Sequence, residues 1–278
     1  ISAIENAESF MMLRIEDFGT TGLIGGEHAV GDETSPFAAF VRNNLDSSKS
    51  SRGAGGSFGL GKAASWTCSN LFTVAIATNV ATPPPHARGD DLRFIAKSEL
   101  AWHELGDHAY AGPGWLSDAN EPFSSSWVPS SSLEPLYLDR TDLPDGVDET
   151  DRTGTSLLIL GFHDPAQDGP PDGTRVVDDL VRAAALNFWP AILDEALTVH
   201  VDHRVNDRCI RDEEVRPEDS IPEFVEAYRT YRDGDTVAIG EADGDVVKRS
   251  IPLGLMPTRK GQRSVTPIAK KVDAETHL

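Results

Sequence analysis

Apolar residues along the chain fall into short runs with the length of β-strands. Such runs lie at residues 10–15, 71–78, 92–97 and 153–162, and the second is rich in the β-branched residues that favour strands. Residues 106–135 are rich in glycine, serine and proline and are expected to be irregular. The pattern predicts a sheet whose strands follow one another along the chain.

Helical spacing marks a second set of elements. Apolar residues repeat at intervals of three and four between Val176 and Phe188, which predicts one long amphipathic helix. Pro190 is expected to interrupt it, because proline removes a backbone donor. Shorter helices are predicted at 62–70 and 222–232.

The stretch from residue 23 to residue 54 is mostly polar and carries little core. The exception is a short helix predicted at 35–44, with Ser35 as its N-cap and Pro36 at its first position. A segment of this length between two glycine-rich motifs is typical of a mobile lid.

The mixture of strands and helices predicts an α+β fold. We expect a two-layer sandwich, with a mostly antiparallel sheet and helices on one face. Residues 1–205 form the predicted first domain, and residues 206–278 the start of a second one. That acidic remainder contains a strand predicted at 246–253.

Composition restricts the partners and the cell compartment that can be expected for the protein. The chain is 39% hydrophobic and 25% charged, as in ordinary globular proteins, and has no apolar run of about 20 residues, so no membrane partner is expected. Two cysteines, Cys68 and Cys209, are too few for a disulfide framework or a zinc site, which favours the cytoplasm. A net charge of −20 gives no indication of nucleic-acid binding.

Glycine is concentrated in one run, Arg52-Gly-Ala-Gly-Gly-Ser-Phe-Gly-Leu-Gly-Lys-Ala-Ala-Ser-Trp66. The run passes into a predicted helix that begins near Lys62. Glycine lets backbone amides approach a ligand closely, and a helix N-terminus favours anions. The run therefore predicts a phosphate-binding loop, although a flexible surface linker is the ordinary alternative.

Three common nucleotide motifs fit this run poorly. A P-loop from Gly56 to Lys62 lacks its Ser or Thr, because Ala63 stands there. A dinucleotide motif at 59–64 lacks a preceding strand, since 46–51 is polar. A kinase reading of Asp17-Phe-Gly19 has its parts in the wrong order and no H-R-D loop.

Three segments, taken in order, resemble the glycine boxes of the GHKL (Bergerat-fold) ATPases. This superfamily includes gyrase B, the ninety-kilodalton heat-shock chaperones, histidine kinases, MutL and MORC proteins. The segment Ile15-Glu-Asp-Phe-Gly-Thr-Thr-Gly22 resembles the first box, and Gly56–Lys62 resembles the second. Gly154-Thr155, entering an apolar strand, resembles the third. The resemblance spans residues 10–205 and implies a Bergerat-type sandwich.

The resemblance implies ATP and Mg²⁺ as ligands, with no metal-ligating residue identified in the chain. Asp17 would accept a hydrogen bond from the adenine amino group, Thr155 would support that carboxylate, and Lys62 would meet the phosphates. The positions carried over are Asp17, Gly19, Thr21, Gly22, Gly56, Ser57, Phe58, Gly59, Leu60, Gly61, Lys62 and Thr155. Each of these three residues also has an ordinary structural explanation: Asp17 as a turn aspartate, Thr155 as a strand threonine and Lys62 as an exposed lysine.

The chain departs from the family pattern in two ways. The first box has an extra residue, which leaves the role of Gly22 open. The family's helix with a Glu base and an Asn is not found, because Glu5 and Asn6 lie too close to Asp17. We expect that helix upstream of Ile1, and the catalytic residues stay unknown.

Two functions follow from the resemblance. The first is an ATP-binding and ATP-hydrolysing module that couples nucleotide state to lid closure and dimerisation in a larger protein. DNA repair, DNA topology and antiviral (phage) defence are all compatible settings, and the second domain would be transducer-like. The alternative is a non-hydrolysing nucleotide-sensing scaffold that controls a partner protein. A histidine-kinase domain fits less well, because the segment at 80–150 is long for that class.

Overall fold

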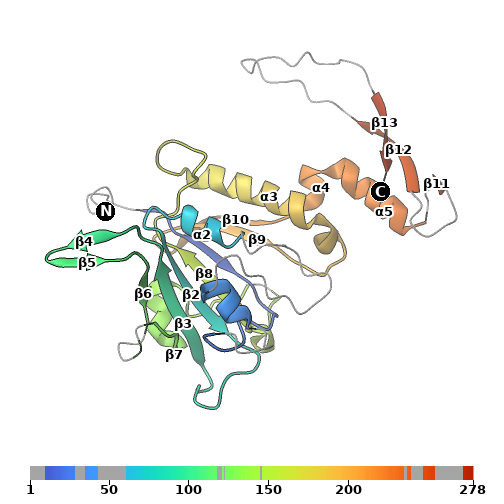
Figure 1. Cartoon of the computed structure of the whole chain (residues 1–278). Coiled ribbons are helices and arrows are strands. Elements are labelled where there is room, and N and C mark those ends of the chain that lie inside the picture. Colours follow the sequence, from blue (N-terminus) through green and yellow to red (C-terminus); the bar gives the residue numbers. More distant parts are fainter. Residues whose placement is uncertain are drawn as a thin grey trace. The chain divides into compact units, whose positions relative to one another are not determined.

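The computed structural model of the chain divides into two compact units, Ile1–Pro171 and Asp172–Leu278 (Figure 1). It describes residues 10–28, 35–42, 61–117, 121, 123–144, 146–234, 237–238, 247–253 and 272–277. The division falls earlier than the boundary expected after residue 205. The long helix α3 (Gly173–Leu193) therefore belongs to the second unit.

The first unit is built on a six-stranded antiparallel sheet in the order β1-β8-β2-β3-β6, with β7 also paired to β3. Its strands are β1 (Leu13–Glu16), β2 (Thr73–Asn79), β3 (Asp91–Ser98), β6 (Gly114–Leu116), β7 (Ser126–Pro129) and β8 (Gly154–Ile159). All four apolar runs expected to be strands in this part contribute to it. Because β8 lies between β1 and β2, the segments before and after the glycine-rich run meet in one sheet.

The expectation that residues 106–135 are irregular was wrong. This stretch contains β6 and β7, and it also holds β5 (His108–Tyr110), which forms a hairpin with β4 (His103–Leu105). Each of these strands has only three or four residues, too few to show an alternating pattern. The backbone of β3 supplies the hydrogen-bonding partners that order β6 and β7.

Helical elements pack on one face of this sheet. They are η1 (Ala38–Arg42), a single π-helical turn, and α2 (Ala63–Thr67). Their apolar side chains Phe37, Val41 and Trp66 form one cluster with Val74, Ile76, Ile95 and Ile159 of the strands. Each such buried side chain stabilises the fold by about 1.5–3 kcal/mol.

The helix predicted at 35–44 is present in shortened form, and its predicted cap is confirmed. The Ser35 hydroxyl accepts a hydrogen bond from the Ala38 amide at 3.1 Å and donates to the Gly26 carbonyl at 2.7 Å. The cap therefore also ties the helix to the segment that follows the first glycine box.

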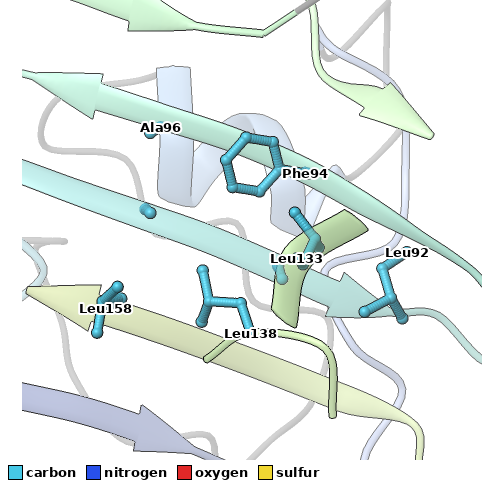
Figure 2. Close-up of a cluster of buried hydrophobic side chains, with 8 residues drawn as sticks. Leu92, Phe94, Ala96, Leu133, Leu138 and Leu158 are labelled. Atoms are coloured by element: carbon cyan, nitrogen blue, oxygen red, sulfur yellow. The ribbon is translucent and has the colours of Figure 1, made fainter. Parts of the chain in front are cut away.

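The opposite face is covered by η2 (Ser130–Leu136), a 3₁₀ helix. Figure 2 shows Leu133 and Leu138 lying against Leu92, Phe94, Ala96 and Leu158 of the sheet. A second short 3₁₀ turn, η3 (Glu149–Asp151), precedes β8. Both faces of the central strands are thus buried, which explains their nearly continuous apolar sequences.

The second unit contains α3 and a set of shorter elements. These are the hairpin β9 (His200–Val205) and β10 (Arg208–Glu214), the helices α4 (Pro217–Ser220) and α5 (Pro222–Arg232), and the strands β11 (Val237–Ala238), β12 (Val247–Leu253) and β13 (Val272–His277). The helix predicted at 222–232 is confirmed, as is the strand predicted at 246–253.

The predicted break at Pro190 was wrong, because α3 continues to Leu193. Proline has a helical φ and removes only one hydrogen bond of the helix, so packing on either side can override it. Ile192, which follows the proline, packs against the buried cluster that contains Ala184 and Val215. Side chains on both sides of Pro190 thus hold the helix in one piece.

Candidate functional site

Asp17 and Thr155 lie side by side where β1 ends and β8 begins. The register pairs Ile15 with Leu157 and Glu16 with Ser156, so the next residues along the two strands, Asp17 and Thr155, lie opposite each other. The Asp17 amide donates to the Thr155 carbonyl at 3.0 Å. The Thr155 amide in turn donates to Asp17 Oδ1 at 2.9 Å. A carboxylate 138 residues away in sequence is thereby fixed at the start of β8.

The turn after Asp17 fixes the other carboxylate oxygen. The Thr20 hydroxyl donates to Asp17 Oδ2. The turn itself is held by the Gly19 amide, which donates to the Asp151 carbonyl at 2.8 Å, and by the Thr20 amide, which donates to the Thr153 carbonyl at 3.3 Å. Asp17 remains exposed to solvent. Its carboxylate is therefore oriented by the protein and still accessible to a ligand.

Two glycines allow the strands to approach this closely. Gly154 has a φ of 143°, and a Cβ there would lie 2.1 Å from the Asp17 carbonyl oxygen. Gly22 has a φ of 66°, and a Cβ there would lie 2.6 Å from the carbonyl oxygen of Asn79. No other residue fits either position without displacing backbone. Gly22, whose role the sequence left open, thus brings the first-box turn against β2.

Thr78 of β2 joins the two boxes from within the sheet. Its side chain is fully buried, at 0% exposure. The hydroxyl accepts from the Leu23 amide at 2.9 Å, donates to the Gly154 carbonyl at 2.9 Å and lies 3.3 Å from the Thr155 hydroxyl. A single buried hydroxyl thus fastens the first-box loop to the start of β8.

Arg140 supports the junction of β1 and β8 from the face of the sheet opposite to Thr78. Its guanidinium, 2% exposed, donates to the carbonyls of Asp17 at 2.7 Å and Arg152 at 2.9 Å. It also donates to Ser156 Oγ at 2.7 Å, and that hydroxyl donates to Glu16 at 2.6 Å. Burial lowers the pKa of the Arg140 guanidinium, and the carboxylates of Glu16 and Asp17 oppose that shift. The cation is therefore held by backbone carbonyls beneath Asp17.

Glu27 anchors the segment that leads away from the site. Its carboxylate accepts from Arg93 at 3.0 Å, from the Ser125 amide at 2.9 Å and from Arg42 in η1. Arg93 also donates to the Gly25 carbonyl at 2.6 Å. Burial acts to raise the pKa of Glu27, but the hydrogen bonds from Ser125, Arg42 and Arg93 outweigh it and lower the pKa to about 2.

The remaining predicted positions are only partly brought to Asp17. Thr21 uses its carbonyl to accept the Ala81 amide at 3.1 Å, which again joins the first box to the residues after β2. The Lys62 ammonium donates to the Ala39 carbonyl of η1, so this lysine contacts the helical turn beside its own helix. Residues 56–60 lie outside the described residues, and Gly61 begins the turn before α2.

The described residues also form an open depression of about 520 Å³ at the edge of the sheet by β7. It is lined by His86, Arg88, Asp91, Glu121, Ser125, Ser126, Trp127 and Pro129. None of these residues belongs to the glycine boxes. The depression therefore adds nothing to the site at Asp17.

Sequence reasoning missed Thr78, Arg140 and Glu27. None of them lies in a glycine motif, and each has a partner that is far away in sequence: Leu23 lies 55 residues from Thr78, Arg93 lies 66 residues from Glu27, and Asp17 lies 123 residues from Arg140. Only the fold reveals that Thr78 and Arg140 meet at the junction beside Asp17, and that Glu27 fixes the segment that follows the first glycine box. The single available signal was the polarity of Thr78 and Arg93 within otherwise apolar strands.

Comparisons of the chain with protein-family models, with curated proteins and with solved structures found no match. Among the residues that the structure describes, no cluster of three or more His, Cys, Asp or Glu side chains is arranged to hold a metal ion. No helix in that part of the chain is both long and apolar enough to cross a membrane.

Proposed function

We propose that the first unit is an ATP-binding module of GHKL type. The observation that carries this proposal is the oriented and solvent-accessible carboxylate of Asp17, held by the Thr155 amide and the Thr20 hydroxyl. A carboxylate in this state is a strong acceptor for the exocyclic amino group of adenine. The three glycine boxes that the sequence places in order would then supply the adenine end and the phosphate end of one site.

The phosphate end is assigned to the glycine-rich run that leads into α2. Its backbone amides and the N-terminal positive end of a helix suit a polyphosphate. Lys62, at the start of α2, adds a cation next to this run. No residue is assigned as a Mg²⁺ ligand, because no three His, Cys, Asp or Glu side chains gather among the described residues. In nucleotide sites Mg²⁺ is commonly held by one or two carboxylates together with the phosphates of the nucleotide.

Hydrolysis is the property that separates an ATPase from a nucleotide-sensing scaffold. It requires a carboxylate that is free to activate water. Glu27 is saturated by two arginines and Ser125, and Glu16 is paired with Arg14 and Ser156. Neither glutamate is suited to act as a base, so hydrolysis would need a base other than these two, and the nucleotide-sensing scaffold is kept as the second candidate.

Isothermal titration calorimetry of the intact chain tests the proposal. ATP and adenosine are both expected to bind, with ATP tighter because its phosphates add contacts at the glycine-rich run. Saturating ATP is also expected to raise the melting temperature. If neither ATP nor adenosine binds, the proposed function is contradicted. Release of phosphate in the same preparation would identify an ATPase, and binding without turnover a scaffold.

A further inference from the structure

We propose that Thr78 sets the direction of the hydrogen bonds in the site, and thereby makes it select bases that carry an amino group at the position facing Asp17. This inference rests on the proposed function, because it concerns which nucleotide the same site accepts. It assigns Thr78 a role as a positioning residue that determines specificity without touching the ligand.

The contacts of Thr78 account for every hydrogen-bonding capacity of its hydroxyl. A threonine hydroxyl has one proton and two acceptor lone pairs. The Gly154 carbonyl, 2.9 Å away, can only accept, so it takes the proton. The two lone pairs then receive the Leu23 amide at 2.9 Å and the Thr155 hydroxyl at 3.3 Å. Thr155 is therefore the donor in its contact with Thr78.

This arrangement decides what the site presents to a ligand. The Thr155 proton is directed at Thr78, so a ligand can meet the Thr155 oxygen only as an acceptor. The Thr20 proton is likewise used, because a carboxylate oxygen of Asp17 can only accept it. The hydroxyl protons of Thr20, Thr78 and Thr155 are thus all used within the protein. The oxygens of Asp17, Thr20 and Thr155 therefore remain acceptors.

A row of acceptors discriminates between an amino group and a carbonyl. Adenine presents an amino group at C6, which donates to such oxygens. Hypoxanthine presents a carbonyl oxygen at C6, which would face the Asp17 carboxylate without a proton between them. A ligand oxygen that faces only acceptor oxygens finds no proton, which lowers the affinity. Sites built for an N–H group therefore reject analogues that lack it. ATP and ITP, which share the same phosphates, therefore form the appropriate pair of probes.

The test measures the affinity of ATP and ITP by calorimetry in the wild type, Thr78→Val and Thr78→Ser. The wild type is expected to prefer ATP by about 30-fold, the scale of one charge-assisted hydrogen bond. In Thr78→Val the Thr155 proton loses its acceptor and becomes available to the C6 oxygen, so the ratio is expected to fall about tenfold. Thr78→Ser keeps the hydroxyl and is expected to restore the ratio.

The ratio of the two affinities separates this role from a structural one. Thr78→Val removes the hydroxyl that accepts from the Leu23 amide and donates to the Gly154 carbonyl, so both nucleotides lose affinity if the site merely loosens. An unchanged ratio would then overturn the proposal. Thr73→Val, at the far end of β2, where the hydroxyl meets Ser98 at 2.7 Å, is the matched control and is expected to keep the wild-type ratio.

A second variant protects the test against a folding failure of Thr78→Val. Thr155→Val removes the acceptor itself and leaves Asp17 in place, so ATP is expected to lose more affinity than ITP. Equal losses would overturn the proposal. A wild type that binds ATP and ITP equally would also overturn it while leaving the proposed function intact. A wild type that binds neither would contradict the function itself.

Discussion

At the scale of single residues, Glu27 makes the stability of the first unit depend on pH. Its pKa of about 2 lies below the ordinary value of 4.5, because its ionised form is bound by two arginines and Ser125. A depressed pKa means that the unfolded state binds the proton more readily. The stabilisation is therefore complete above pH 4.5 and is lost as the pH falls towards 2.

We expect Glu27→Gln to remove this pH dependence. Denaturant titrations of the wild type should lose on the order of 2 kcal/mol of unfolding free energy between pH 5 and pH 2 through this group, after allowance for solvent screening. The variant should be less stable at pH 7 and should lose less on acidification. Glu134→Gln, at an exposed glutamate on η2, serves as the control. Parallel pH profiles for the wild type and Glu27→Gln would contradict the assignment.

The residues of the site differ in how far sequence could predict them. Asp17, Gly19, Gly22 and Thr155 lie in glycine motifs, and the structure brings all four to one junction. Their role in binding ATP stays a prediction. Thr78 is marked only by its polarity within an apolar strand, and Glu27 carries no local signal, because the role of each comes from partners that the fold brings to it. Buried polar residues of this kind require the tertiary structure.

At the scale of elements, the junction of β1 and β8 depends on Gly154. We expect Gly154→Ala to destabilise the first unit by about 3 kcal/mol, because it combines an unfavourable φ with a clash against the Asp17 carbonyl. Chemical denaturation measures the loss. Gly89→Ala is the matched control, since a Cβ there meets no atom within 4 Å. Equal stability of the two variants would show that β1 can separate from β8 without cost.

Elements were predictable where the hydrophobic pattern was long. The strands at 71–78 and 92–97 and the helix at 222–232 were each found where their apolar pattern predicted them. The short strands β6 and β7 were not, because they depend on β3 for their hydrogen bonds. The passage of α3 through Pro190 was missed for a related reason, since packing beyond the proline overrides a local preference.

At the scale of the whole molecule, the two units have separate cores. The α+β class predicted from the sequence is confirmed, whereas residues 52–60 of the glycine-rich run lie outside the described residues. The boundary after residue 205 came from the acidic composition of the remainder and from the extent of the family resemblance, and it stays a prediction; the structure shows that α3 packs with β9 and Val215 in the second unit. Side chains that lie far apart in the sequence thus place α3 with the elements that follow it.

Separate cores predict two transitions in scanning calorimetry. ATP should raise the temperature of one transition only, because a ligand stabilises the unit that binds it. Val215→Ala, in the buried cluster of the second unit, should lower the other transition by removing core contacts. A single transition that responds to both changes would contradict the independence of the units.

The central claim is that the Asp17 carboxylate receives the amino group of ATP, and titration of Asp17→Asn with ATP tests it most directly. Asparagine keeps one acceptor for the Thr155 amide at this position but replaces the other oxygen with a donor that repels an amino group. Affinity for ATP is expected to fall about 100-fold, while Asp107→Asn, in the exposed turn between β4 and β5, should bind as the wild type does. Wild-type affinity in a folded Asp17→Asn protein would contradict the claim.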